Sequence, residues 1–297
     1  MTMTTFHLPR LARRLPLLAG LLAGVLALGT AAPQASAAEA VVPPRNSWSF
    51  AGPFGHYDAT QLQRGFKVFR EVCANCHSAN LLAFRNLSEE GGPQFSEAQV
   101  TALAKEYKVK DGPNDSGDMF ERPGRPADRW PAPFPNKQAA AAANGGAAPP
   151  DFSVLAKART YERGFPWFLF DIVLQFQEQG PDYITALLQG YKEPEHGVEV
   201  PDGKYYNEYF PGHIISMPPP LNDGQIEYPK DASGKPQAPE TVAQYAKDVT
   251  AFMMWVAEPH LEARKELAFK ILAFLLVFAG LLYFTKKKIW STVEGHA

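Results

Sequence analysis

The residues best suited to chemistry form one short motif, Cys73-Ala74-Asn75-Cys76-His77. Two cysteines three residues apart on a helical turn can reach the two vinyl groups of one porphyrin as thioethers, and the adjoining histidine can then ligate the iron. This C-x-x-C-H spacing is typical of covalent haem attachment. The motif therefore predicts one haem c, held by Cys73 and Cys76 and ligated by His77.

Three other kinds of site use part of the same pattern. A redox-active dithiol also has two cysteines at this spacing, but it follows a strand and makes no use of the histidine. A zinc site needs four ligands, and the sequence has no cysteine besides these two. A disulfide between residues so close in the chain would be strained. Haem is the interpretation that uses all three side chains.

The sixth iron ligand is not decided by spacing. Met217 is favoured because three prolines follow it, which hold it in an extended backbone and stiffen the loop. A methionine opposite a histidine raises the reduction potential relative to two histidines and leaves no open position for a substrate. A second histidine stays an alternative. The remaining candidates are Met119, Met253, Met254, His56, His196, His213 and His260.

Hydrophobic periodicity predicts the elements that position the motif. Leu62, Phe66, Phe69 and Val72 recur at helical spacing, so a helix leads into Cys73. Further helices are expected at 96–107, where Ser96 and Gln99 form a capping box, and at 165–176, 181–189 and 242–256. Eight prolines between 111 and 150 predict a long loop with a short helical piece at 137–143. Residues 191–240 are expected to form loops and a short hairpin, so the fold class is mainly α with long Pro/Gly-rich loops.

The N-terminal residues 1–37 have the pattern of a cleaved secretory signal peptide. Arg10, Arg13 and Arg14 precede the apolar stretch 15–29, and Ala35-Ser36-Ala37 resembles a cleavage site. A retained membrane helix is the alternative, although the stretch is short for a span. We therefore expect residues 38–260 to form an exported domain.

A second apolar stretch runs over residues 267–284, interrupted only by Lys270, which can snorkel to the membrane surface. Lys286, Lys287 and Lys288 follow it and predict a cytoplasmic tail. The expected organisation is a transmembrane anchor at 261–285 and a tail at 286–297. This places the chain in the bacterial inner membrane with its domain in the periplasm. A buried core helix is the alternative.

The charge balance limits the partners. The formal net charge is −2, and the exported domain is more acidic because the signal peptide and the C-terminal tail carry mostly basic residues. An acidic domain favours basic partners and argues against nucleic acid, although ordinary solubility would account for the same charge.

In addition to the motif, eight stretches spread along the chain resemble the cytochrome c1 family, the haem c subunit of the quinol:cytochrome c oxidoreductase (cytochrome bc1 complex). They are Arg64–Phe69, Asp111–Asn114, Met119–Gly124, Pro149–Ser153, Tyr205–Gly212, Ile215–Pro220, Val242–Val249 and Ala257–Pro259. The resemblance implies a cytochrome c-like haem domain with one C-terminal transmembrane helix.

The resemblance also implies roles for individual residues. Met217 and His77 would ligate the iron, and Arg159 would contact a haem propionate. Asn144 and Tyr183 would be neighbours of the haem. This sequence departs from the shorter family members at 161–180, where it has an insertion that we expect to form a helix on the surface or near the membrane.

The implied function is one-electron transfer. The haem would accept an electron from a Rieske iron-sulfur protein and pass it to a soluble cytochrome c, in a complex with cytochrome b, so the chain would not be an enzyme on its own. The alternatives are another anchored c-type cytochrome, a haem peroxidase and a dithiol oxidoreductase.

Overall fold

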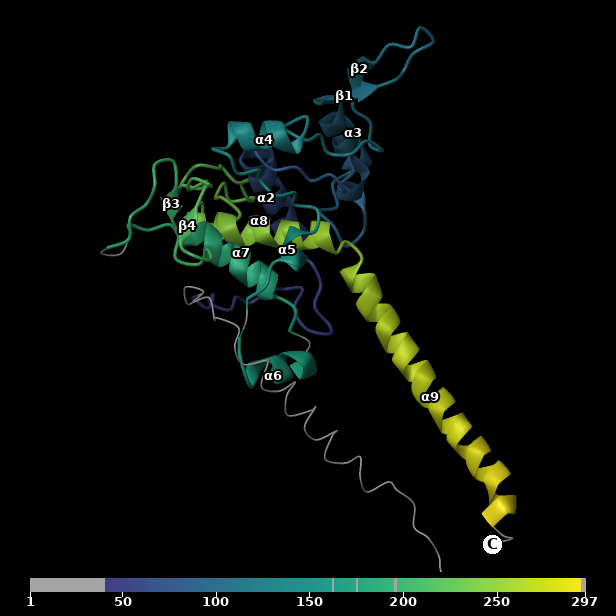
Figure 1. Ribbon diagram of the computed structural model, residues 1–297. Coiled ribbons are helices and arrows are strands. Elements are labelled where there is room, and N and C mark those ends of the chain that lie inside the picture. The colour runs from purple at the N-terminus through teal and green to yellow at the C-terminus, as the bar shows by residue number, and fades with distance from the viewer. Residues whose placement is uncertain (1–40, 162, 175, 195–196, 295–297) are drawn as a thin grey trace, which may run out of the picture. The chain divides into compact units, whose positions relative to one another are not determined.

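The computed structural model describes residues 41–161, 163–174, 176–194 and 197–294. The expected signal peptide at 1–37 and His196 lie outside these residues. The described part is mainly helical, with two small two-stranded sheets (Figure 1). The α-helices are α2 (Ala59–Glu71), α3 (Glu97–Lys105), α4 (Lys137–Ala143), α5 (Leu155–Ala158), α6 (Trp167–Leu174), α7 (Gln179–Gln189), α8 (Val242–Ala257) and α9 (Leu261–Glu294).

The helices agree with the periodicity of the sequence. The expected capping box of α3 is present, since the hydroxyl of Ser96 accepts from the amide of Gln99 and the side chain of Gln99 accepts from the amide of Ser96. Helix α2 begins after Asp58, whose carboxylate accepts from the amides of Thr60 and Gln61. These bonds satisfy amide groups that a helix start otherwise leaves unpaired.

The loop expected at 111–150 contains more structure than the prolines indicated. Strands β1 (Lys108–Asp111) and β2 (Phe120–Pro123) form an antiparallel hairpin in which Lys108 lies opposite Pro123. Arg122 holds the hairpin, because its guanidinium pairs with both Asp111 and Asp128. The short hairpin expected within 191–240 is formed by β3 (Tyr205–Tyr206) and β4 (Ile214–Ile215).

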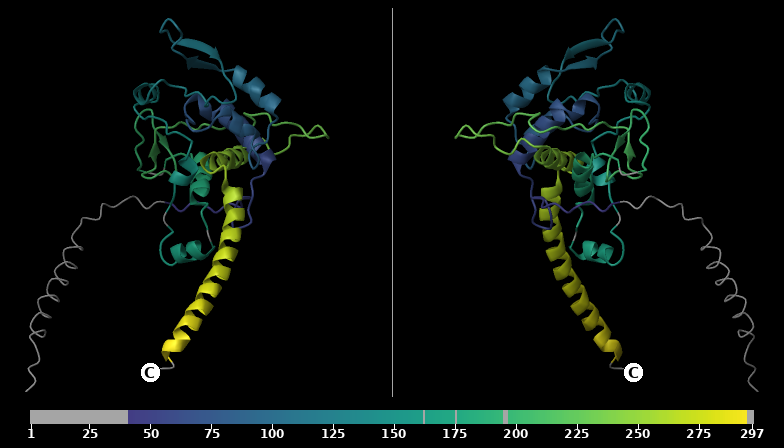
Figure 2. Two further views of the ribbon diagram at one scale, coloured as in Figure 1. Left: turned by 90° about the vertical axis from the view of Figure 1, so that its right-hand side faces the viewer. Right: turned by 90° about the vertical axis from the view of Figure 1, so that its left-hand side faces the viewer.

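Helices α2 and α8 form the centre of the domain and lie against each other in all the views (Figures 1 and 2). Phe66 and Phe69 of α2 pack on Phe252 of α8, with ring centroids 5.6 and 5.4 Å apart. All three rings are buried. Burial of large aromatic side chains is a main source of stability in a domain of this size.

Gly65 allows the two helices to approach closely. A Cβ atom at this position would lie 2.1 Å from the carbonyl oxygen of Asp248 and 2.8 Å from Cβ of Phe252. Both distances are too short for any side chain, and one of the contacts is to backbone. The crossing of α2 and α8 therefore requires glycine at position 65.

Asp248 joins this crossing to its surroundings and is fully buried. Its carboxylate accepts hydrogen bonds from Nε of Arg64 at 2.8 Å, from the hydroxyl of Tyr228 at 2.9 Å and from the side-chain amides of Gln61 and Gln244 at 3.1 and 2.9 Å. A buried charge is tolerated when it is paired and hydrogen-bonded in this way. The network links α2, α8 and the loop that contains Tyr228.

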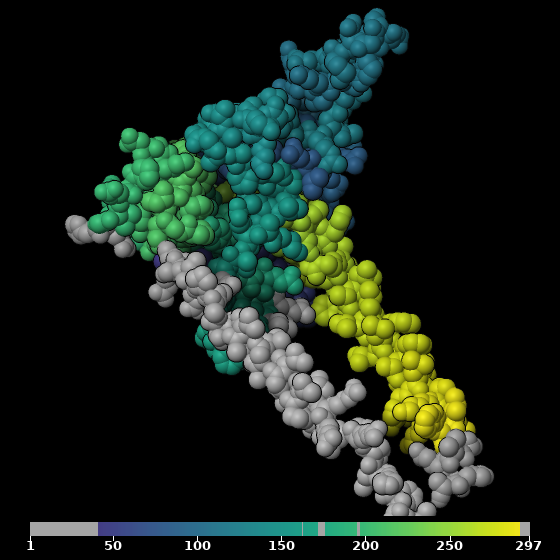
Figure 3. All heavy atoms as spheres, viewed as in Figure 1, coloured from purple at the N-terminus to yellow at the C-terminus, as the bar shows by residue number. Residues whose placement is uncertain are grey.

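Helix α9 is long and apolar enough to span a membrane, and none of its apolar window is buried. In Figures 1 to 3 the yellow helix extends away from the other described elements beyond its first turns. The helix continues through Lys286, Lys287 and Lys288, so the expected boundary at residue 285 is not a break in secondary structure.

Substitution of Gly65 by alanine should lower the free energy of unfolding by about 1–3 kcal/mol, because the added methyl group overpacks the α2–α8 crossing. The loss should occur although alanine has the higher helix propensity. Thermal and urea unfolding followed by circular dichroism would measure it. The control is Thr60→Ala, at an exposed position of the same helix, and equal stability of the two variants would contradict the prediction.

Candidate haem site

The motif lies immediately after α2, in a turn of 3-10 helix at Cys73–Asn75. The amides of Cys76 and His77 both donate to the carbonyl of Cys73, at 3.1 and 2.8 Å. One tight turn therefore brings the two cysteines and the histidine together. Both thiols are free, with Cys73 half-buried and Cys76 exposed. Two free thiols on one turn fit the thioether attachment of a porphyrin.

The environment of the thiols does not fit a redox-active dithiol. Such sites lower a thiol pKa, often at a helix N-terminus. Here the motif follows the C-terminal end of α2, where the helix dipole disfavours a thiolate. Burial and the neighbouring Cys76 raise the pKa of Cys73 to about 12. The described residues contain no group of three His, Cys, Asp or Glu side chains that could hold a metal.

The imidazole of His77 is oriented for ligation. Its Nδ1 donates to the carbonyl of Pro150 at 2.8 Å, and its ring packs on Phe152 with centroids 4.3 Å apart. With the proton on Nδ1, Nε2 carries the lone pair that a metal needs. Burial lowers the pKa of His77, although the carbonyl of Pro150 and the charge of Asp151 act in the other direction. The neutral, oriented ring fits an iron ligand.

The segment that orients His77 is itself held by Asp151. Its carboxylate accepts from the hydroxyl of Ser78 at 2.7 Å and from the amides of Asn80 and Ser153 at 2.9 and 2.8 Å. The amide of Phe152 donates to the carbonyl of Ser78 at 2.8 Å. Burial alone would raise the pKa of Asp151, but these hydrogen bonds outweigh it and hold the pKa below the ordinary aspartate value. The segment Pro150–Ser153 is thus bound to the residues that directly follow His77.

Met217 is half-buried and directly follows strand β4 and Ser216. The hydroxyl of Tyr191 donates to its backbone carbonyl at 3.1 Å, and Lys204 donates to the hydroxyl of Ser216 at 2.7 Å. The prolines at 218–220 follow directly. The backbone of Met217 is therefore held from both sides while its side chain stays partly accessible.

The other described methionines are placed differently. Met253 and Met254 are each 2% exposed within the hydrophobic core, and Met119 is 63% exposed next to the β1–β2 hairpin. Among the histidines, His213 stacks on Tyr206 at 5.5 Å and has a positive φ of 60°. These positions favour Met217 over the other methionines.

The charge of Arg159 acts on Tyr183. Burial raises the pKa of Tyr183, and the positive charge of Arg159 opposes the rise. The pKa of Tyr191, which bonds Met217, is raised by burial and by Tyr183. Electrostatic interactions thus connect Arg159 to Tyr183 and Tyr183 to Tyr191, and a hydrogen bond connects Tyr191 to Met217. Arg159 is exposed.

Asn144 is not tied to these residues by a described contact. It ends α4, and its side chain donates to the carbonyl of Ala140 at 2.7 Å. Two supporting residues, Tyr191 and Asp151, were not among those predicted from the sequence. Asp151 lies within one of the stretches that carry the family resemblance, whereas nothing in the sequence marked Tyr191.

The family model described as the cytochrome C1 family matches residues 48–293. The chain belongs to the cytochrome c1 family. It is 62% identical over 271 residues to a protein named cytochrome b/c1 of Bradyrhizobium diazoefficiens, a match that covers 91% of this chain and 38% of that protein. It is 48% identical over 275 residues to cytochrome c1 of Blastochloris viridis, and this match covers 92% of this chain and 95% of that protein. It is 40% identical over 273 residues to the Solanum tuberosum protein named "cytochrome c1-2, heme protein, mitochondrial". This match covers 92% of this chain and 94% of that protein.

Membership confirms the family expected from the eight stretches, and the mainly α fold with a C-terminal apolar helix is also confirmed. The name of the potato relative contains the word heme, which supports haem as the group that this family binds. The assignments of Cys73, Cys76, His77, Met217, Arg159, Asn144 and Tyr183 stay predictions.

Asp151→Asn should destabilise the protein at pH 7 by about 1–2 kcal/mol, because the amide replaces a charged acceptor of three hydrogen bonds. The pKa of Asp151 is depressed in the folded state, so its contribution is present above the unfolded-state pKa of about 3.9 and is lost as the pH falls below it. The difference in the free energy of unfolding between variant and wild type should therefore become smaller as the pH falls from about 4 to the folded-state pKa of Asp151.

Urea unfolding at a series of pH values would measure this difference. Asp118→Asn, which changes an exposed aspartate in the β1–β2 loop, serves as the control and should leave the stability unchanged. A difference for Asp151→Asn that stays constant with pH would contradict the prediction.

Proposed function

We propose that the chain binds one haem c and works as a one-electron carrier in a quinol:cytochrome c oxidoreductase. Cys73 and Cys76 would form the thioethers, and His77 and Met217 would be the axial ligands. The observation that carries the proposal is the hydrogen bond from Nδ1 of His77 to Pro150, which presents Nε2 as a ligand beside two free thiols. A bound haem supplies an iron that changes its oxidation state by one electron.

The chain's own residues hold and tune that iron rather than transform a substrate. His77 is oriented by Pro150 and Phe152, and burial lowers its pKa and so favours the neutral imidazole. Met217 would fill the sixth position, which raises the reduction potential and leaves no site for oxygen or peroxide. Arg159, which is exposed beside Tyr183, would pair with a propionate, and Asn144 would be a further neighbour. The chain is therefore proposed to be a subunit of an oxidoreductase and not an enzyme on its own.

The proposed partners are a Rieske iron-sulfur protein as electron donor, a soluble cytochrome c as acceptor and cytochrome b as a neighbour in the complex. The name cytochrome b/c1 of the relative from Bradyrhizobium diazoefficiens supports an association with cytochrome b. The acidic balance of residues 38–260 supports a basic electron acceptor.

The proposed location is the inner membrane of a bacterium, with the domain at 38–260 in the periplasm after cleavage of residues 1–37. The anchor at 261–285 would cross the bilayer, and residues 286–297 would be cytoplasmic. The apolar helix α9 and the lysines at 286–288 support this orientation, because lysine-rich ends stay on the cytoplasmic side.

Met217→Leu should abolish the near-infrared methionine-to-iron band of the oxidised protein and lower its reduction potential, while the pyridine haemochrome spectrum stays that of a c-type haem. Visible spectroscopy and a redox titration on membrane-extracted protein would test both. Met119→Leu, at an exposed methionine, is the matched control and should keep the band.

A band that persists in Met217→Leu would assign the sixth ligand to another residue. The absence of a c-type haemochrome from the wild type would contradict covalent haem altogether.

Fusions of alkaline phosphatase, which is active only outside the cytoplasm, test the orientation. A fusion after Glu258 should be active, and a fusion after Ala297 should be inactive, because the lysines keep the end of α9 in the cytoplasm. Replacing Lys286, Lys287 and Lys288 by glutamine should raise the activity of the second fusion. The reverse pattern of activity would contradict the proposed topology.

A further inference from the structure

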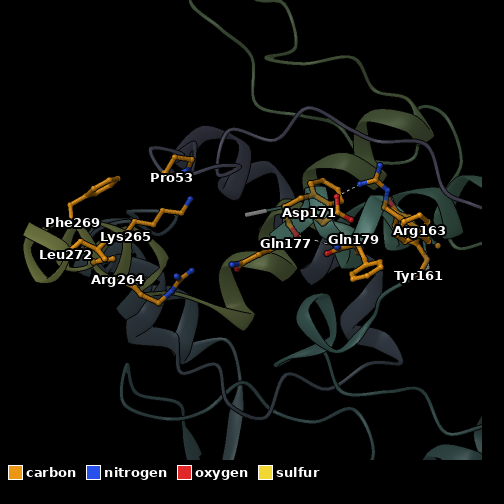
Figure 4. A pocket seen from close by; sticks show the side chains of 15 residues that line it. Pro53, Tyr161, Arg163, Asp171, Gln177, Gln179, Arg264, Lys265, Phe269 and Leu272 are labelled. Atoms are coloured by element: carbon orange, nitrogen blue, oxygen red, sulfur yellow. Dashed lines mark hydrogen bonds and ion pairs between the residues drawn. The ribbon is translucent and has the colours of Figure 1, made fainter. Parts of the chain in front are cut away.

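The insertion at 161–180 forms one wall of a cavity of about 790 Å³, and the start of α9 forms the other. Figure 4 shows Arg264, Lys265, Phe269 and Leu272 of α9 on one side and Tyr161, Arg163 and Asp171 on the other. Two clusters far apart in the sequence thus face one space. None of the haem-site residues lines it.

The first turn of helix α6, within the insertion, exposes four consecutive apolar side chains. Trp167, Phe168, Leu169 and Phe170 are each about half exposed, and Phe165 just before them is 80% exposed. Successive residues of a helix point 100° apart, so these side chains do not form the single stripe that would pack on one protein surface. Such a group of exposed large apolar side chains is unfavourable in water and favourable in lipid.

The cavity lies at the edge of the apolar stretch of α9. Ala268, Phe269 and Leu272, which line it together with Phe165 and Phe168, belong to the first turns of that stretch. Phe269 also stacks on Phe54 with ring centroids 5.2 Å apart. If α9 crosses a bilayer, α6 is at the depth where the hydrocarbon begins.

The cavity wall carries an excess of positive charge in Arg163, Arg264 and Lys265. Two of the acids nearby are in ion pairs, Asp171 with Arg163 and Arg45 and Glu258 with Arg264 and Lys157. The charges of two more, Glu178 and Glu262, act on Lys265. Lys265 donates to the carbonyls of Phe50 and Gly55, at 2.7 and 3.2 Å. The side chain of Arg264 lines the cavity, is half exposed and bonds Glu258 through Nε, and no hydrogen bond from its two terminal nitrogens is seen within the described residues.

We propose that this cavity binds one anionic phospholipid of the periplasmic leaflet. The phosphate would lie against Arg264 and Lys265, an acyl chain would follow Phe168, Phe269 and Leu272, and α6 would lie in the boundary between headgroups and hydrocarbon. A cationic rim above an apolar wall matches a lipid with a negative headgroup. A free phosphate would not use the apolar wall. The proposal rests on the proposed crossing of the membrane by α9.

Nitroxide labels test the immersion of α6 in the haem-loaded, full-length protein in nanodiscs. Separate cysteine variants place the label at Leu169 in α6, at Leu276 in the middle of α9 and at Phe120 in the β1–β2 hairpin. The label at Leu169 should respond to dissolved oxygen more, and to a water-soluble relaxing agent less, than the label at Phe120. The label at Leu276 should show the strongest oxygen response.

The outcomes separate the two proposals. A water-like label at Leu276 would overturn the membrane anchor. A lipid-like label at Leu276 with a water-like label at Leu169 would overturn the lipid site alone, and shielding of Leu169 that arises only in the assembled complex would assign the cavity to a protein subunit. Labelling of the unsubstituted protein would show that Cys73 and Cys76 are not in thioethers, which bears on the haem only.

Native mass spectrometry tests the headgroup. The wild type should retain one phosphatidylglycerol more tightly than phosphatidylcholine, and Arg264→Gln should weaken that binding about fivefold, the loss expected for one cation near a lipid phosphate. The same loss should occur in a Lys286→Gln background, which removes a cation at the other end of α9. No effect of Arg264→Gln in either background, equal binding of the two lipids, or displacement by inorganic phosphate would overturn the lipid site.

Discussion

The fold depends on the close crossing of α2 and α8 at Gly65. Because no side chain separates the helices there, the carboxylate of Asp248 comes within reach of Arg64 and Gln61 on α2. The same carboxylate also takes the hydroxyl of Tyr228, which ties a long loop to the helix pair. Removing one partner of such a buried charge lowers the free energy of unfolding more than the loss of a single surface interaction does. The helix crossing and the hydrogen-bond network around Asp248 therefore stabilise each other.

The candidate haem site follows from that crossing, since the motif begins two residues after α2 ends. The helix fixes the position of the turn, and Asp151 binds the next segment to Ser78 and Asn80. Pro150 is thereby placed where its carbonyl can accept from His77. The orientation of one imidazole thus depends on backbone geometry and on a carboxylate that does not touch it.

The sequence predicted those parts that depend on local pattern. The helices α2 and α8 follow from apolar spacing, and the cap of α3 follows from Ser96 and Gln99. The β1–β2 hairpin could not be predicted, because its strands are polar and are held by Arg122 through Asp128, which lies outside both. The role of Tyr191 could not be predicted either, because its hydroxyl bonds the carbonyl of Met217, 26 residues away, and such a bond produces no pattern in the sequence. Asn144, expected from resemblance, caps α4, and within the described residues its hydrogen bonds go to nearby residues, Ala140, Ala141 and Ala147.

The junction between α8 and α9 is short and is held by several ion pairs and hydrogen bonds. Glu258 lies between the helices and pairs with Lys157 and Arg264. Glu262 accepts from the amide of Tyr57, and Lys265 donates to the carbonyls of Phe50 and Gly55 in the segment before α2. A junction held by so many bonds is rigid, so the domain and α9 would move together. In the proposed role, the domain would keep a constant height and tilt above the bilayer. The proposed electron donor and acceptor would then have to move to the haem domain, and their docking surfaces would have to fit a domain that does not move toward them.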